Sequence, residues 1–536
     1  MGPTDAGDRE APDRQTPGFR MPDWETLTAL AVLTLMALAL RVALLSESLW
    51  LDELHTAWTV AGSGSDLPAR ALAGNTGPAW FYLPAASVGL FGWSEAALRL
   101  PSLVAGLLVL PALFFVVRRM TSSNVAALFA AAAAAVDPSF LHFSVEARAY
   151  SAVQLASIVQ IGILWTLLEQ PGPRRAVGLA IVSALLVHLH YTAALLLIAE
   201  GLFAIGWLCV SRTARASAGR ALLGAAALTL VLCLPAVPHV LEVGRRRDAW
   251  SAFILDGSLS DLFSLFPLGR YGFAPLALLA MAWLASRFIG ERWRLQRVSG
   301  RAVALCLTWL AVPALLVWLS TRFGVAALFE PRYVVASAAA PLALAALALA
   351  ALANPIARVG CAVFVASLCV IASPLGRWAV EGRIAPRVGE GWRSAVSHIN
   401  ADREHRDLPV LLRSGLIESD RLRSKDYATK SALYEFSLLP VATLYALTPP
   451  ERSVSPLRRS RSAALSAAQI ELVLRQAGAW LLIRGSERGA ADIAARIREG
   501  FAKQGHPGRV SAGVSYGSVR VYQFVLDGGP TDRPVR

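Results

Sequence analysis

The chain has 536 residues, of which 55% are hydrophobic and only 16% are charged. Soluble domains carry about a quarter charged residues, so this composition excludes an ordinary soluble enzyme. The apolar residues are concentrated in residues 27–376, and the remainder of the chain has a mixed composition. The sequence therefore predicts an α-helical polytopic membrane protein with a soluble C-terminal tail.

The net charge is +14, from 51 Lys and Arg against 37 Asp and Glu. In a membrane protein this balance is typical of basic cytoplasmic loops that fix the orientation. The arginines are scattered among loops rather than gathered on one face, which disfavours nucleic-acid binding. The five cysteines lie inside apolar segments without the spacing of a metal site, so we interpret them as packing residues.

Residues 1–24 are rich in Pro, Gly, Asp and Arg and predict a disordered cytoplasmic leader. The apolar segment 27–45 is too long for a signal-peptide core, so we interpret it as the first span. Basic connections alternate with acidic and aromatic ones, which places the N-terminus inside and the C-terminus outside. Ten further segments approach the ~20 residues that cross a bilayer: 100–117, 122–138, 150–168, 176–190, 191–210, 221–239, 273–289, 302–320, 333–353 and 358–374.

Residues 78–92 are apolar, but they are short and aromatic at one end. Counting them as a span would put Arg118 and Arg119 on the outer side, against the positive-inside rule. We therefore expect an interfacial helix within a first outer loop of residues 46–99.

The tail, residues 376–536, is long enough for one small α/β domain. Periodicity predicts helices at 392–400, 463–476 and 490–503, strands at 410–412 and 480–483, and a hairpin over 509–526 around residues 515–517. The expected organisation is thus a leader (1–24), a transmembrane domain (25–375) and an extracytoplasmic domain (376–536).

Polar residues gather at the outer ends of the predicted spans, where charge is costly. Asp52 and Glu53 are adjacent, so on a helix they point in different directions and can hold different roles; solvated interfacial acids are the ordinary alternative. Separate outer segments contribute Asn75 to Pro78, Glu95, Arg99, Glu146, Arg148, Tyr150, His188, His190, Tyr191, Arg245 to Arg247, Arg270, Glu330, Arg332 and Tyr333. Singly, each has an ordinary explanation, such as a snorkelling arginine. Together, arginine forks suit phosphate and a neighbouring acid suits proton abstraction, which indicates chemistry on a lipid-linked phosphate.

The order of these motifs resembles that of the GT-C membrane glycosyltransferases, in particular the bacterial relatives of protein O-mannosyltransferases and aminoarabinose transferases. The resemblance covers residues 25–375 and depends on five motifs: WLDE (50–53), LRLPS (98–102), EARAY (146–150), HLHY (188–191) and PRY (331–333). It implies a multi-pass protein of a bacterial inner membrane. Many members have His-Pro-Pro or Lys-Pro-Pro where this chain has Thr76, Gly77 and Pro78, so no donor contact or metal ligand is carried over to this position.

The resemblance implies an inverting transfer of a hexosyl or pentosyl group from a polyprenyl-phosphate donor to a hydroxyl of a lipid, glycan or protein acceptor. It places the catalytic acids at Asp52, the general base, and Glu53, which we expect to orient arginines or to bind acceptor hydroxyls. It also implies donor-phosphate contacts from Arg332, Arg148, Arg99 and Tyr333, and substrate contacts from Glu146, Tyr150, His188, His190 and Tyr191. No cofactor is assigned, and a divalent cation is left open.

The sequence leaves two alternative functions open. A transporter or flippase of lipid-linked sugars is disfavoured because the polar residues lie at the outer ends of the spans rather than at the bilayer midplane. A ligase that uses a diphosphate-linked donor is disfavoured, weakly, by the acid pair in the first outer loop.

Overall fold

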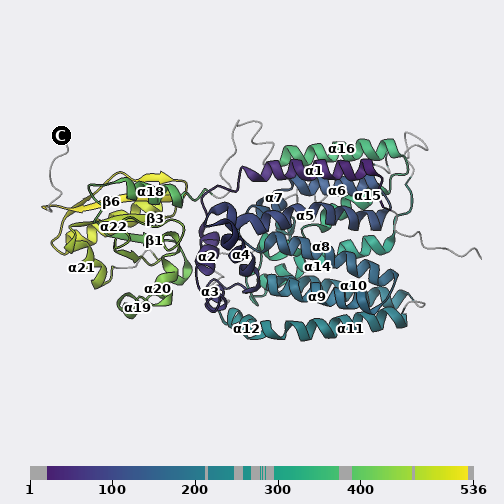
Figure 1. The fold of residues 1–536 in the computed structure, drawn as a ribbon, viewed down its shortest axis with the longest axis horizontal. Helices are drawn as coiled ribbons and strands as arrows, with labels where there is room; N and C mark the ends of the chain where they lie inside the picture. The colour runs from purple at the N-terminus through teal and green to yellow at the C-terminus, as the bar shows by residue number, and fades with distance from the viewer. Residues whose placement is uncertain are drawn as a thin grey trace, which may run out of the picture.

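The computed structural model describes residues 21–211, 215–246, 257–266, 278, 280–281, 284, 295–373, 389–460 and 465–528. Figure 1 shows a bundle of long helices at one end of the molecule and a smaller α/β domain at the other, with short helices between them. Most of the predicted leader, the start of the predicted tail domain and nearly all of the predicted span 273–289 lie outside the described residues.

The bundle consists of helices that run side by side (Figure 1): α1 (Trp24–Val42), α5 (Glu95–Thr121), α6 (Asn124–Val136), α8 (Tyr150–Glu169), α9 (Pro173–Leu189), α10 (Ala194–Val210), α11 (Arg215–Cys233), α14 (Gly300–Arg322), α15 (Ala340–Ala350) and α16 (Pro355–Ala372). Ten of the predicted spans each coincide with one of these helices. Within the described residues, six helices are long and apolar enough to cross a membrane, or up to eight if two bent pairs each form one span. The chain is therefore a multi-pass membrane protein.

Helices in the interior of the bundle carry small residues, and helices at its periphery carry large apolar residues. Helix α15 is almost pure Ala and Leu and is buried all round, against the Ala-rich α6. Small side chains let helices approach closely in a membrane. The peripheral helices instead expose large apolar residues such as Leu35, Ile198, Leu223 and Val363, which suits contact with lipid tails.

The predicted span 122–138 is not one straight helix. It bends by 60° between α6 and α7 (Pro138–Ser144). Pro138 has no N–H to continue the helix, and the Asp137 carboxylate accepts hydrogen bonds from the N–H groups of Ser139 and Phe140. A proline and an N-cap residue side by side therefore start a new helix, and α7 leads directly to the EARAY segment.

Short elements form a layer between the bundle and the α/β domain: α2 (Leu51–Val60), α3 (Leu67–Ala73), η1 (Ala79–Phe81), α4 (Tyr82–Phe91), η2 (Tyr191–Ala193), η3 (Leu234–Ala236), α12 (Val237–Arg245), η5 (Leu259–Leu265) and η8 (Pro331–Ser337). The predicted interfacial segment is the short helix η1–α4, which ends at Gly92. Tyr82, Leu90 and Phe91 are exposed, as expected at an interface, whereas Trp80 is buried inside the protein.

The C-terminal domain has a mixed sheet in the order β2-β1-β3-β6-β4, with β5 also paired to β6. Strands β1, β2 and β3 are parallel, and β6 runs antiparallel to β3, β4 and β5. The predicted strands, helices and hairpin are confirmed where the residues are described. The elements are α18 (Trp392–Ala401), β1 (Val410–Arg413), η9 (Ile417–Arg421), α19 (Ser424–Thr429), α20 (Ala432–Ser437), η10 (Leu439–Val441), β2 (Val454–Pro456), α21 (Ala467–Arg475), β3 (Gly478–Arg484), α22 (Glu487–Lys503), β4 (Gly508–Val510), β5 (Val514–Tyr516) and β6 (Val519–Leu526).

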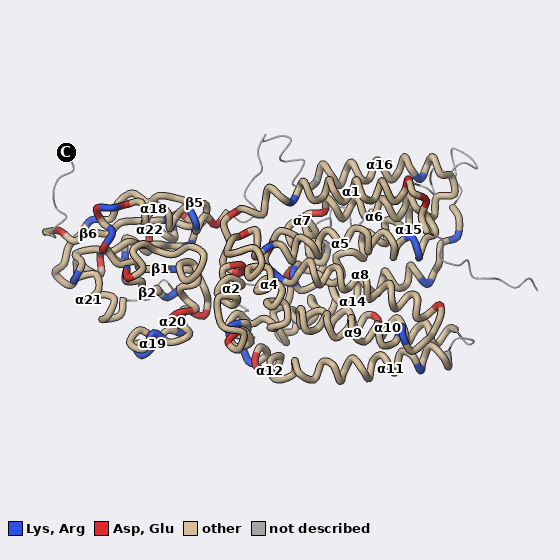
Figure 2. The backbone as a smooth tube through the Cα atoms, in the orientation of Figure 1, with Lys and Arg blue, Asp and Glu red and all other residues tan. Residues whose placement is uncertain are grey.

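The two faces of this sheet belong to two different cores. Leu411 and Leu481 point to one face and pack among residues of α21 and α22. Leu412 and Trp480 point to the other face, into a core that also contains Leu54 of α2. Because side chains alternate along a strand, one sheet holds its own helices and is also fixed to the first outer loop. Figure 2 shows charged residues mainly on this domain and at the two ends of the bundle.

Candidate functional site

A cavity of about 600 Å³ lies where the bundle, the intermediate layer and the C-terminal domain meet. Its wall combines many apolar and aromatic side chains with a few polar ones, as in most small-molecule sites. The polar and charged residues of the wall are Asp52, His55, Asn75, Thr76, Arg148, Tyr150, His190, Tyr191, Thr192, Arg332, Tyr333, Glu418 and Arg484.

Asp52 and Arg332 face each other in this cavity. Asp52 is the second residue of α2, and Arg332 lies in η8 at the start of a bent span. Their Oδ2 and Nη1 atoms are 3.4 Å apart, and about 30% of each side chain is exposed (29% and 32%). The guanidinium carbon of Arg332 also lies 5.5 Å from the centre of the Tyr333 ring. The pair is thus loosely joined and open to the cavity, so an anion or a hydroxyl can reach either group.

Arg148 supplies a second positive charge to the cavity. It is 8% exposed, and its Nη1 lies 3.4 Å from the main-chain oxygen of Asp52 and 3.3 Å from Nδ1 of His55. Burial, and next the charge of Arg148, lower the pKa of His55 to about 4. His55 is therefore neutral at pH 7, with Nδ1 accepting from Arg148 and Nε2–H donating to the Arg70 oxygen at 2.9 Å.

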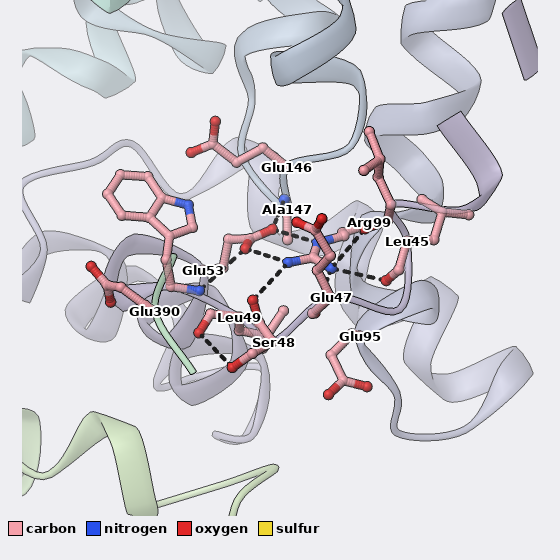
Figure 3. A network of polar contacts seen from close by, with 12 residues as sticks. Leu45, Glu47, Ser48, Leu49, Glu53, Glu95, Arg99, Glu146, Ala147 and Glu390 are labelled. Atoms are coloured by element: carbon pink, nitrogen blue, oxygen red, sulfur yellow. Dashed lines mark hydrogen bonds and ion pairs between the residues drawn. The ribbon is translucent and has the colours of Figure 1, made fainter. Parts of the chain in front are cut away.

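Glu53 and Arg99 form a separate ion pair beside the cavity (Figure 3). Both side chains are fully buried, with Nη2 and Oε2 at 2.6 Å and Nε and Oε1 at 2.7 Å. Arg99 also donates to four main-chain oxygens, those of Leu44, Leu45, Glu47 and Ser48. Glu53 accepts from the N–H of Ala147 at 2.8 Å. The pair thereby ties the end of α1, the start of α2 and the EARAY segment together.

Residues 75–239 match the model of the dolichyl-phosphate-mannose-protein mannosyltransferase family. The structure resembles ArnT from Cupriavidus metallidurans, both bound to undecaprenyl phosphate (14% identity, TM-score 0.51, 95% of this chain and 100% of that chain) and in the apo state (16%, 0.52, 93% and 97%). It also resembles the Archaeoglobus fulgidus oligosaccharyltransferase tethered with an acceptor peptide (13%, 0.52, 96% and 75%). The chain has the GT-C fold. No curated protein matches the chain.

Within this GT-C fold, seven of the predicted site residues share the cavity. They are Asp52, Arg148, Tyr150, His190, Tyr191, Arg332 and Tyr333. The His190 ring lies between those of Tyr150 and Tyr333, with centroids 5.6 and 6.1 Å away. Tyr191 is held by a 2.8 Å hydrogen bond between its hydroxyl and Nδ1 of His239. Segments that are far apart in the sequence therefore bring these seven side chains to one cavity.

Four predicted site residues do not line the cavity: Glu53, Arg99, Glu146 and His188. Glu53 and Arg99 bind each other, and Arg99 also donates to main-chain oxygens. The side chain of Glu146 is 1% exposed, and its Oε2 lies 3.3 Å from Nε2 of His142. His188 lies in the last turn of α9, and its Nε2 is 3.0 Å from the Leu232 oxygen, whereas His190 follows the helix in an extended conformation.

Three ionisable residues of the cavity wall, His55, Glu418 and Arg484, are absent from the predicted site. His55 follows Asp52 by three residues on one helix, and that spacing was a usable signal. Glu418 and Arg484 come from the C-terminal domain, where no local pattern distinguishes them. Of the predicted outer arginines, Arg245 and Arg246 pair with Glu242, whereas Arg247 and Arg270 lie outside the described residues. In the described part of the chain, no group of three or more His, Cys, Asp or Glu is arranged to hold a metal ion.

Proposed function

We propose that the protein transfers a sugar from a polyprenyl-phosphate donor to an acceptor hydroxyl at the outer face of the membrane. The observation that carries this proposal is the open pair Asp52–Arg332, an acid beside a cation in a cavity at one end of the bundle. The family match over residues 75–239 and the likeness to an ArnT structure bound to undecaprenyl phosphate support it.

In the proposed mechanism, Asp52 takes the proton of the acceptor hydroxyl as its oxygen attacks the anomeric carbon. The bond between that carbon and the phosphate oxygen breaks, and its electron pair leaves with the polyprenyl phosphate. Arg332 and Arg148 stabilise the charge that develops on the leaving phosphate, which preorganised cations in a restricted cavity do effectively. One displacement with one base inverts the anomeric centre, so no second nucleophilic acid is required.

The neutral state of His55 has a role in this mechanism. A protonated His55 would repel Arg148 and could no longer accept its hydrogen bond. Because burial keeps the ring neutral, His55 holds Arg148 toward Asp52 without cancelling the positive charge that the phosphate needs.

The orientation is also part of the proposal. Arg118, Arg119, Arg175 and Arg358 lie at helix ends opposite to the α/β domain (Figures 1 and 2). The positive-inside rule assigns that end to the cytoplasm, so the cavity opens on the outer face of what we propose is a bacterial inner membrane.

The test uses purified protein in nanodiscs with a panel of radiolabelled polyprenyl-phosphate sugars. Wild type is expected to release polyprenyl phosphate from one donor, by transfer or slow hydrolysis. Asp52→Asn should lower that rate at least 100-fold, as loss of a general base does, while Asp66→Asn, an exposed acid of the same loop, should react as wild type. Undiminished turnover by Asp52→Asn would remove the assigned base, and no release from any donor by wild type would overturn the proposed reaction.

A further inference from the structure

The C-terminal domain supplies one side of the cavity, through residues 415–418, Phe436 and Arg484. Opposite charges are unevenly placed around the wall. Arg332 and Arg148 lie on the membrane-domain side, next to Asp52. Glu418 lies on the C-terminal-domain side, where its charge and that of Asp52 act on each other. The two sides therefore favour different chemical groups.

Glu418 is held in place by the first outer loop. Nδ2 of Asn75 donates to Oε1 of Glu418 at 3.4 Å, across 343 residues of sequence. Asn75 has a φ of 59°, a left-handed conformation that asparagine tolerates better than most residues, so the turn after α3 presents its amide to the acid. Burial, and next the negative charge of Asp52, raise the pKa of Glu418 above its ordinary value. A carboxyl group in this setting binds hydroxyl or ammonium donors and disfavours anions.

Arg484 does not reverse this preference. Its Nε lies 2.7 Å from Oε1 of Glu390, which is 2% exposed, so its charge is countered by a buried carboxylate. The other oxygen of Glu390 accepts from the N–H of Leu51 at 3.1 Å and from Trp392 at 2.8 Å. Arg484 and Glu390 therefore join the C-terminal domain to the start of the helix that carries Asp52.

Aromatic rings from the C-terminal domain and from the first outer loop also line the cavity. Phe436 lies edge-on to His55 and Trp58, with centroids 5.7 and 5.5 Å away, and Trp50 and Trp80 also line the wall. Flat apolar rings beside one hydrogen-bonding acid match the two kinds of surface on a sugar, its C–H faces and its hydroxyl edges. Among the described residues of the C-terminal domain, Arg484 is the only cation that lines the cavity, and its charge is countered by Glu390.

We infer that Glu418, oriented by Asn75 and flanked by Phe436, forms an acceptor subsite for the hydroxyls of a neutral or amino sugar. This inference rests on the proposed function, because it assigns the other half of the same cavity. It gives the C-terminal domain the role of selecting the acceptor, while the membrane domain binds the donor.

Direct binding tests the subsite without requiring turnover. The probes are hexyl glucoside, hexyl mannoside, hexyl glucosaminide and hexyl glucuronide, measured by saturation-transfer NMR on the protein in nanodiscs. We expect wild type to bind at least one neutral or amino glycoside at least ten-fold more tightly than the glucuronide. Glu418→Gln should weaken that binding about ten-fold and lose the discrimination against the anion. Glu435→Gln, an exposed acid of the same domain, should match wild type.

Donor hydrolysis separates this inference from the proposed function. Glu418→Gln should melt close to the wild-type temperature, which reports a folded protein, and the exposed control Glu435→Gln should hydrolyse the donor at the wild-type rate. The inference is overturned if Glu418→Gln binds the glycosides as Glu435→Gln does, if the glucuronide binds as tightly as the neutral probes, or if no glycoside binds. If wild type binds a glycoside but releases no polyprenyl phosphate from any donor, the result would support the subsite and contradict the proposed reaction.

Discussion

Asp52 and Glu53 are adjacent in the chain, yet they lie in opposite environments. Asp52 meets Arg332 at 3.4 Å with about a third of each side chain exposed, whereas Glu53 meets Arg99 at 2.6 Å with both side chains fully buried. Consecutive residues on a helix point about 100° apart, which is enough to turn one acid into the cavity and the other into the protein. An open pair can exchange its partner for substrate, and a closed pair cannot.

The closed pair, Glu53–Arg99, also holds the main chain around the open pair, Asp52–Arg332. Glu53 and Arg99 fix the main chain on both sides of Asp52, and through Ala147 they fix the residue before Arg148. A rigid ion pair next to Asp52 would hold the groups of the proposed reaction in position. Substitutions in the closed pair should therefore lower the stability of the protein, whereas substitutions in the open pair should lower its turnover.

The largest expected effect comes from breaking the closed pair. Arg99→Met leaves Glu53 charged and buried without its partner, which costs about 3–5 kcal/mol. Thermal unfolding in nanodiscs measures the change. The matched control is Arg393→Met, which removes a partly exposed pair with Glu95 and should cost less than about 1 kcal/mol. Equal losses in the two variants would contradict the assignment of Glu53–Arg99 as the central structural pair.

The open pair should show the opposite phenotype. Arg332→Gln removes the cation that we propose stabilises the leaving phosphate, so donor turnover is expected to fall about 10²–10³-fold, with a melting temperature close to that of wild type. Arg322→Gln, at an exposed site ending α14, should leave both properties unchanged. Release of labelled polyprenyl phosphate measures the rate. If Arg332→Gln loses much stability but keeps its rate per folded molecule, Arg332 would be a structural residue and not one that acts in turnover.

Much of this comparison could be predicted from the sequence, because spans, their order and the outer polar segments are local features. Parallel helices bring their outer ends together, so Asp52, Arg148 and Arg332 could be expected to share one site. Local patterns do not say which arginine meets which acid, so the ion pair between Arg99 and Glu53 could not be predicted. Glu418 could not be found, since its contact with Asn75 spans 343 residues and depends on how the C-terminal domain docks.

His55 should make the stability of the protein depend on pH. Its pKa is about 4 in the folded protein against an ordinary value of 6.5, so between these values the unfolded chain binds a proton that the folded chain does not. The contribution of His55 to the free energy of unfolding is fully present above pH 6.5. The free energy of unfolding then falls by up to about 3 kcal/mol as the pH drops to 4. Melting curves from pH 7.5 to 4.5 should show this loss in wild type and a smaller one in His55→Gln. Parallel curves would show that His55 is not the group responsible.

Gly74 carries the smallest expected effect. A Cβ on Gly74 would lie 2.2 Å from Cε1 of His55, whereas one on Gly64 in the same loop would meet nothing within 4 Å. Gly74→Ala must displace the ring, with an expected cost of about 1–3 kcal/mol and a weaker hold on Arg148. Gly64→Ala should be close to neutral. In a His55→Ala background the ring is gone, so the same Gly74→Ala change should cost much less. If its cost is unchanged there, the glycine serves the turn before Asn75 rather than the histidine that positions Arg148.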